Sequence, residues 1–292
     1  MPKILITTVP FGECNRLPLD LLESSEIEYL INPYNKKLTE NQLLELIGDF
    51  DVLLAGTEPI TDKVMTQAPN LKFISRVGIG LDSVDLNAAR RRGIKVSYTP
   101  DAPSPAVAEL TLGMILSLLR SVHISNNQIR QGNWKRILGR RLNDITIGII
   151  GVGRIGTLLL RCMGGFGRIR ILVNDIMPRK QLNREFNLEW VTKEQIYQDA
   201  DVISLHLPLT PLTKNMICSE QLLQMKKNAF IINTSRGGII NEKDLHKVML
   251  EGHLGGAAID VFENEPYAGN LVEIERCLLT AHMGSMSIDC RS

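Results

Sequence analysis

The sequence has no excess of charge of either sign. Its 292 residues include 33 Lys and Arg against 32 Asp and Glu, which leaves a formal net charge of +1. A chain with balanced charge has no long-range field that attracts polyanions. We therefore expect neither nucleic acid nor a membrane surface as a partner.

Cysteine patterns, a secretory signal and a long apolar run are also missing. The five cysteines are scattered without a C-x-x-C pair, which predicts reduced thiols and no metal site. The opening MPKILITTVP lacks the zones of a secretory signal, so we expect a cytoplasmic protein. The longest apolar stretch, residues 106–119, is interrupted by Glu109 and too short to span about 30 Å of hydrocarbon. It favours a buried or interface helix.

Short β-rich runs alternate with segments that can each hold one helix. This alternation predicts parallel strands joined by crossover helices. The length suits about two domains, and the proline-rich stretch TPDAPSPAVAEL separates them. We predict two doubly wound α/β domains, residues 1–99 and residues 100–284. The expected strands are KILITT, IEYLI, DVLLAG, LKFISRV and IKVSYT, then ITIGII, RILVN, DVISLHL, AFIINTS, GGAAIDVF and CLLTAH.

A glycine motif, GVGRIG, follows the expected strand ITIGII and precedes a segment that can start as a helix. In a dinucleotide-binding fold the first glycine permits a tight turn, the second lets a pyrophosphate approach, and the third lets helix and strand pack. The amides at the helix start then hold the phosphate charge. Glycines also cluster in ordinary turns, so the motif alone is weak. The candidate cofactor residues here are Gly151, Gly153, Arg154, Ile155 and Gly156.

Asp175 ends the next expected strand, about 20 residues after Gly156, where a dinucleotide-binding domain places the acid that binds the adenosine ribose. Such a carboxylate repels a 2′-phosphate, so the sequence favours NAD over NADP. Two alternatives remain. Asp175 could simply start the turn DIMP, and Arg179 nearby could tolerate a phosphate.

Three polar residues follow expected strands of the second domain, at the edge where open α/β sheets bind ligands. Arg236 has a planar fork that can bind a carboxylate. His282 can exchange a proton near neutral pH. Glu265 can favour the imidazolium and orient its ring. Taken singly, each has a structural alternative: a capping or inter-strand arginine, a packed or surface histidine, and a solvated acidic turn.

Together these stretches resemble the D-isomer-specific 2-hydroxyacid dehydrogenases, with similarity from about Asp51 to Gly284. The stretches that carry the resemblance are RVGIGLDSVDLNAARRRGIKVSYTP, GVGRIG, LHLPLTPLTKNMI, INTSRGGIINEKDL, GGAAIDVFENEP and TAHMGS. The resemblance implies a flavodoxin-like substrate domain, a Rossmann NAD-binding domain and a homodimer whose interface contains the long apolar helix.

The resemblance also implies roles for single residues. Arg236 would bind and polarise the substrate, His282 would be the acid/base, and Glu265 would support the histidine. Asp260 would lie beside the nicotinamide, and the cofactor groove would be lined by His206, Pro208 and Thr234.

The first domain has a glycine turn of its own, RVGIG, in which Ser83 occupies the place of the third glycine. Its backbone amides from Val77 to Gly80 could cradle the substrate carboxylate, as members of the family do. Arg76 and Arg136 stand where phosphoglycerate dehydrogenases place cations, but Ala55 stands near a position where those enzymes often have another arginine.

The predicted function is hydride transfer between NAD and a D-2-hydroxyacid, with D-3-phosphoglycerate the leading substrate. Glyoxylate, hydroxypyruvate and lactate-type substrates stay open, and formate is disfavoured because Glu265 replaces the amide of formate dehydrogenases. An NAD-sensing corepressor is the alternative from another class. Family members continue past TAHMGS with a helix that returns to the first domain. We therefore expect a shortened form, with residues 285–292 heading toward that domain, a weakened link between domains and no serine feedback.

Overall fold

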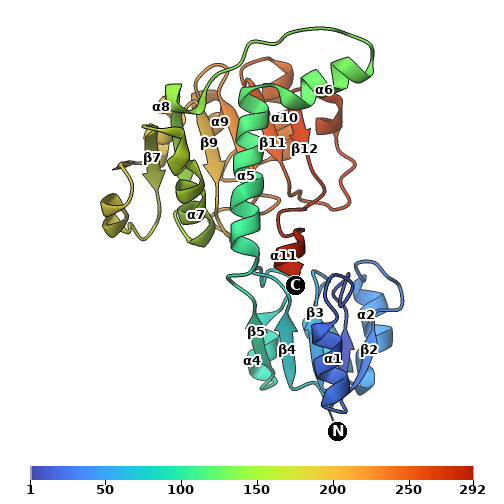
Figure 1. Cartoon of the computed structure of the whole chain (residues 1–292). Coiled ribbons are helices and arrows are strands. Elements are labelled where there is room, and N and C mark those ends of the chain that lie inside the picture. Colours follow the sequence, from blue (N-terminus) through green and yellow to red (C-terminus); the bar gives the residue numbers. More distant parts are fainter. Residues whose placement is uncertain (1, 292) are drawn as a thin grey trace. The chain divides into compact units, whose positions relative to one another are not determined.

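The computed structural model describes residues 2–291, and the chain divides into two compact units (Figure 1). The first unit comprises Met1–Pro103 with Ser285–Ser292, and the second comprises Ser104–Gly284. Each unit has its own parallel β-sheet with helices in the connections between strands.

The first unit is a five-stranded parallel sheet with the strand order β2-β1-β3-β4-β5. Leu5, Leu53 and Ile74 on its inner strands are fully buried, as expected for strands covered on both faces. The strands are β1 Lys3–Ile6, β2 Glu28–Ile31, β3 Val52–Ala55, β4 Phe73–Arg76 and β5 Lys95–Tyr98. The helices are α1 Leu17–Ser24, α2 Glu40–Leu46, η1 Ile47–Asp49, α3 Asp62–Gln67, α4 Leu86–Arg91 and the C-terminal α11 Ile288–Arg291.

Side-chain caps mark the starts of α2, α3 and α4 in the first unit. Thr39 forms a capping box with Gln42 at the start of α2, and Thr61 and Asp85 accept backbone N–H bonds at the starts of α3 and α4. These caps satisfy amides that the first helical turn leaves without partners. They end the loops that leave the carboxyl ends of the strands, where open parallel sheets bind ligands.

The second unit is a seven-stranded parallel sheet with the order β12-β11-β10-β9-β6-β7-β8. Its strands are β6 Thr146–Ile150, β7 Arg170–Asn174, β8 Leu188–Trp190, β9 Val202–Leu205, β10 Phe230–Asn233, β11 Gly256–Ile259 and β12 Cys277–Leu279. Its α-helices are α5 Pro103–Leu119, α6 Val122–Arg130, α7 Arg154–Met163, α8 Lys193–Asp199, α9 Ser219–Gln224 and α10 Glu242–Leu250. Short 3₁₀ turns are η2 Leu142–Asp144, η3 Gly164–Phe166, η4 Lys180–Arg184 and η5 Asn270–Glu273.

Two apolar clusters cover the faces of the second sheet. On one face α5, which runs alongside the sheet in Figure 1, contributes Ile115 and Leu118 to a cluster that includes Ile147 and Ile149 of β6. On the other face α8 contributes Ile196, beside Ile231 of β10. The strand order reverses between β6 and β9, which makes the crevice beyond their carboxyl ends the expected ligand position.

The predicted fold class, two doubly wound parallel sheets, is confirmed, but one strand was missed. β8 has only three residues, Leu188–Trp190, and pairs with β7 alone. A run this short at a sheet edge carries no periodic pattern, so its pairing depends on β7 having formed.

Among the described residues, no single helix has the length and apolar character needed to cross a membrane. α5 and α6 meet those requirements only when counted together, and they are bent by 65° at the break between them.

Candidate functional site

The glycine loop between β6 and α7 lies at the point where the strand order reverses. Gly151 has a φ of +95°, and a Cβ on it would lie 2.3 Å from the carbonyl oxygen of His206, which follows β9. A Cβ on Gly156 would lie 2.3 Å from the carbonyl oxygen of Gly151. Any side chain at either position would collide with backbone, so the loop can close between the two strands only with glycine.

Gly153, the middle glycine, faces open space, since no atom lies within 4 Å of where its Cβ would be. It is the N-cap of α7, and Arg154 and Ile155 form the first helical turn. The N-terminus of a helix favours an anion, and the open glycine leaves room for one. The loop therefore fits the pyrophosphate of a dinucleotide.

Asp175 follows β7 directly and is held by backbone amides. Its Oδ2 accepts a hydrogen bond of 2.7 Å from the N–H of Val152, and its Oδ1 accepts one of 2.9 Å from the N–H of Met177. Its side chain is partly exposed. These bonds place the carboxylate beside the glycine loop, where it can also accept bonds from ribose hydroxyls.

Arg179 braces the same loop, a role that the sequence did not reveal. Its Nη2 donates to the carbonyl oxygens of Val152 and Gly153, the latter at 3.0 Å, and to the Thr157 hydroxyl at 2.8 Å. The only available signal was a cation four residues after Asp175.

His206, Pro208 and Thr234 stand at the carboxyl ends of β9 and β10. The His206 Nε2 lies 2.9 Å from the buried Ser204 hydroxyl, and its Nδ1 is buried without a hydrogen-bond partner among the described residues. Burial lowers the pKa of His206 to about 4, so the ring is neutral at physiological pH. The Thr234 hydroxyl lies 2.8 Å from that of Thr111 on α5. Pro208 is exposed.

Arg236, Glu265 and His282 follow the neighbouring strands β10, β11 and β12, so the sheet places all three at one edge. The His282 Nδ1 lies 2.9 Å from Glu265 Oε2, while Glu265 Oε1 accepts a 3.1 Å bond from the N–H of Phe262. The His282 Nε2 has no hydrogen bond within the described part of the chain, and 42% of this side chain is exposed. The ring is thus oriented at one nitrogen and accessible at the other.

The turn that carries Arg236 packs tightly against the next strand connection. A Cβ on Gly237 would lie 1.9 Å from the carbonyl oxygen of Phe262, and Gly238 has a φ of +77°. The Asn233 amide donates to the Arg236 carbonyl oxygen at 2.8 Å. The glycines therefore bring the arginine turn against the connection that leads to Glu265.

Asp260 follows β11 directly and is 1% exposed. Its carboxylate accepts hydrogen bonds from the Thr280 hydroxyl and from the N–H groups of Met283 and Gly284. The family resemblance implies a place beside the cofactor for Asp260 and gives no link to these residues.

In the first unit, two of the amides expected to form an anion cradle are already used. The N–H of Val77 donates to the Ala55 carbonyl oxygen at 2.9 Å, and that of Gly78 donates to the Thr99 hydroxyl at 2.7 Å. Among the described residues, no hydrogen bond engages the amides of Ile79 and Gly80. Any cradle in this loop is thus formed by the later residues, because Val77 continues the pairing of β4 with β3.

The two cations predicted for a substrate phosphate differ in their surroundings. Arg76 is 7% exposed, and its guanidinium donates to the carbonyl oxygen of Val77. Arg136 is exposed on the segment after α6. Four residues later, Arg140 pairs with Asp201 at 3.0 Å, at the amino end of β9. Within the second unit, no contact of the described residues brings Arg136 to Arg236 or His282.

The second unit matches a known family model. Residues 112–284 match the NAD binding domain of the D-isomer specific 2-hydroxyacid dehydrogenases. The matched range includes the glycine loop, Asp175 and the three polar residues at the sheet edge.

Curated relatives and a solved structure extend the similarity to nearly the whole chain. The chain is 38% identical to a D-3-phosphoglycerate dehydrogenase of Methanocaldococcus jannaschii over 98% of its length, but spans only 54% of that relative. It is 36% identical to a glyoxylate reductase of Korarchaeum cryptofilum over 89% of this chain and 80% of the relative. A D-lactate dehydrogenase of Aquifex aeolicus, solved with NAD and lactic acid, superposes with a TM-score of 0.86 at 26% identity, covering 98% of this chain and 90% of that one.

Replacing Gly151 with alanine should damage the cofactor loop. The change forces a side chain into a left-handed conformation and against the His206 carbonyl, so we expect the free energy of unfolding to fall by roughly 1–3 kcal/mol and NADH binding to weaken. Urea denaturation and NADH fluorescence measure the two effects. Gly164→Ala is the matched control, because Gly164 has a φ of −56° and open space around it. Equal stability of the two variants would contradict this account of the loop.

Proposed function

The chain belongs to the D-isomer-specific 2-hydroxyacid dehydrogenase family, and from that premise we propose that it interconverts a small D-2-hydroxyacid and its 2-oxoacid with NAD. The observation that carries the proposal is the set at the edge of the second sheet. An imidazole, oriented at Nδ1 by a carboxylate 2.9 Å away and accessible at Nε2, follows β12, and a guanidinium follows β10 two strands away. A proton acceptor and a carboxylate-binding group are what oxidation of a 2-hydroxyacid requires.

His282 is the proposed acid/base. In the neutral ring, the Nδ1–H donates a hydrogen bond to Glu265, so the lone pair is at Nε2. Nε2 takes the proton of the substrate hydroxyl during oxidation and returns it during reduction. Glu265 holds the ring in this tautomer. Arg236 binds the substrate carboxylate through its planar fork. NAD, when bound, supplies the redox chemistry by accepting or returning a hydride at C2 of the substrate.

The proposed cofactor contacts follow the glycine loop and the two strands beside it. The amides at the start of α7, with Arg154 and Ile155, hold the pyrophosphate, and Asp175 binds the adenosine ribose. His206, Pro208, Thr234 and Asp260 line the remainder of the groove. Burial keeps His206 neutral, so its ring adds no charge to the groove.

On the substrate, two candidates have support. D-3-phosphoglycerate is favoured by the similarity to the Methanocaldococcus relative, and Arg76 and Arg136 would then bind the phosphate. A substrate without a phosphate is favoured by the first unit itself. At its strand-order reversal, between β1 and β3, lies the buried carboxylate of Glu58, which accepts bonds from the Thr7 hydroxyl and the N–H of Gly56. A carboxylate at that position repels a second anion.

A panel of hydroxyacids tests the proposed activity and the choice of substrate. We expect NAD to be reduced with at least one of D-3-phosphoglycerate, D-glycerate, glycolate and D-lactate, measured as NADH absorbance. A ratio of kcat/KM for D-3-phosphoglycerate over D-glycerate above one assigns the phosphorylated substrate, and a ratio below one assigns the other class. NADH binding without turnover of any member would contradict the proposed activity and favour an NAD(H)-sensing protein.

Removing the imidazole should slow the reaction and leave cofactor binding intact. General acid/base catalysis contributes about 10² to 10⁴ in rate, so His282→Ala should lower kcat by that factor. The Kd for NADH, measured by fluorescence, should stay within about twofold of wild type because the ring does not bind the dinucleotide. His253→Ala is the control, since His253 contacts the carbonyl oxygen of Met225 away from this edge. Wild-type turnover of the His282 variant would remove it from this role.

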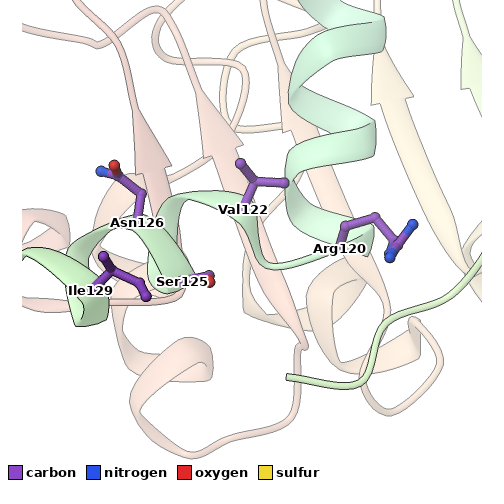
Figure 2. Close-up of a pocket in the computed structure, with 5 residues that line it drawn as sticks. All are labelled: Arg120, Val122, Ser125, Asn126 and Ile129. Atoms are coloured by element: carbon purple, nitrogen blue, oxygen red, sulfur yellow. The ribbon is translucent and has the colours of Figure 1, made fainter. Parts of the chain in front are cut away.

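We also propose a homodimer formed through α6 and the segment that follows it. Val122 and Ile129 lie with Arg120, Ser125 and Asn126 around an open depression on α6 (Figure 2). Trp134 and Leu138 on the following segment are 85% and 101% exposed. Large apolar side chains exposed on a helix and on the segment directly after it are typical of a surface that another protein covers. A second copy of the chain would cover them. The family resemblance implies a homodimer as well, with α5 in its interface.

Sedimentation velocity tests the dimer. Wild-type protein should sediment as a dimer at micromolar concentration, and the double variant Trp134→Ser, Leu138→Ser should sediment as a monomer because the contact loses its largest apolar groups. Leu250→Ser on α10, which removes an apolar side chain that is 65% exposed, should leave the dimer intact. A wild-type monomer, or an unchanged double variant, would contradict the proposed interface.

A further inference from the structure

Asp260 gathers four hydrogen bonds from the five residues around His282. Its Oδ1 accepts bonds from the Thr280 hydroxyl at 2.5 Å and the N–H of Met283 at 2.9 Å, and its Oδ2 accepts one from the N–H of Gly284 at 2.9 Å. Its backbone carbonyl oxygen accepts the N–H of His282 at 2.8 Å. The carboxylate is 1% exposed, so these bonds replace the water that it would otherwise bind.

The residue held by these bonds has a backbone conformation that it would not adopt alone. His282 has a φ of +49°, in the left-handed region, where a side chain with a Cβ is strained. Such a conformation persists only when the surrounding structure imposes it. Bonds to Asp260 from both sides of His282, at Thr280 and at Met283, together with the bond from its own amide, impose it here.

Gly284 lets the last of these bonds form. A Cβ at this position would lie 3.2 Å from Asp260 Oδ2 and 3.2 Å from a methyl carbon of Val107 on α5. Those distances are tighter than ordinary van der Waals contact, so a side chain would push the amide away from the carboxylate.

The ring and the backbone of His282 are therefore held by two different acids. Glu265 fixes the ring through Nδ1, and is itself fixed by the N–H of Phe262. Asp260 fixes the main chain. Both acids belong to the connection that leaves β11, so a single connection determines both the position and the orientation of the imidazole.

We propose that Asp260 is the positioning residue of the acid/base, acting through residues 280–284. The proposal rests on the proposed function of His282. It differs from a cofactor contact beside the nicotinamide, because the bonds of the carboxylate described here all go to protein donors that flank His282. Displacing a reacting group by about 1 Å can cost on the order of 10² in rate, so loss of this clamp should appear in kcat.

The most selective test removes one donor and leaves the carboxylate in place. Thr280→Val keeps the shape of the side chain and loses the hydroxyl. We expect kcat to fall by about 10-fold to 100-fold, with the Kd for NADH unchanged and faster hydrogen exchange at the amides of Met283 and Gly284. Thr280→Ser restores the donor and should recover most of kcat. Thr66→Val is the control, because Thr66 is exposed and its hydroxyl donates to the Asp62 carbonyl oxygen within α3 of the first unit.

The Asp260→Asn variant provides a second test of the proposal. An amide keeps one acceptor and turns its NH₂ toward a backbone N–H of the turn, so we expect a larger fall in kcat and faster exchange than in Thr280→Val. Thr280→Val with wild-type kcat and wild-type exchange, together with an Asp260→Asn variant whose main defect is a raised Kd for NADH, would overturn the clamp. If the wild type oxidises no hydroxyacid, the proposed function fails, whereas the exchange measurement still decides whether Asp260 holds the turn.

Discussion

The carboxyl ends of β10, β11 and β12 lie side by side, and the proposed chemistry depends on this constraint. Parallel pairing in register brings three loops to one edge, although Arg236, Glu265 and His282 are far apart in sequence. The arginine loop after β10 packs closely on the connection that leaves β11. Gly237 against Phe262 is the tightest example. The imidazole is then oriented by a carboxylate from the neighbouring loop.

The same principle operates on the cofactor side of the sheet. Where the strand order reverses, the loop after β6 meets the loop after β9. Gly151 lies so close to the His206 carbonyl that a Cβ on it would collide with the oxygen. Asp175 and Arg179 both hold the glycine loop. The acid accepts a hydrogen bond from a backbone amide of the loop, and the cation donates to carbonyl oxygens of the loop. The loop is thereby ordered by the chain itself, so a dinucleotide meets a formed site.

Several features of the site were accessible from pattern alone. The glycine spacing, the acid at the end of β7 and the polar residues after buried strands each reflect a local requirement of backbone geometry or charge. Other features were not. The use of the Val77 amide by Ala55, the bracing role of Arg179 and the pairing of Arg140 with Asp201 depend on which strands and loops become neighbours. β8 was missed for a related reason, since its pairing partner defines it as a strand.

The sequence by itself determined three things: the alternation of buried strands and helices, the glycine loop, and the types of side chain at the sheet edge. Each depends on a local pattern, in which a motif or a polar residue directly follows a buried strand. Only the tertiary structure decided how those types act together. The bond between His282 and Glu265 and the four bonds that Asp260 accepts join residues 17 to 24 positions apart. These contacts arise because the pairing of β11 with β12 brings residues 280–284 next to Asp260. A buried carboxylate needs hydrogen-bond donors, and the pairing determines which donors lie within bonding distance.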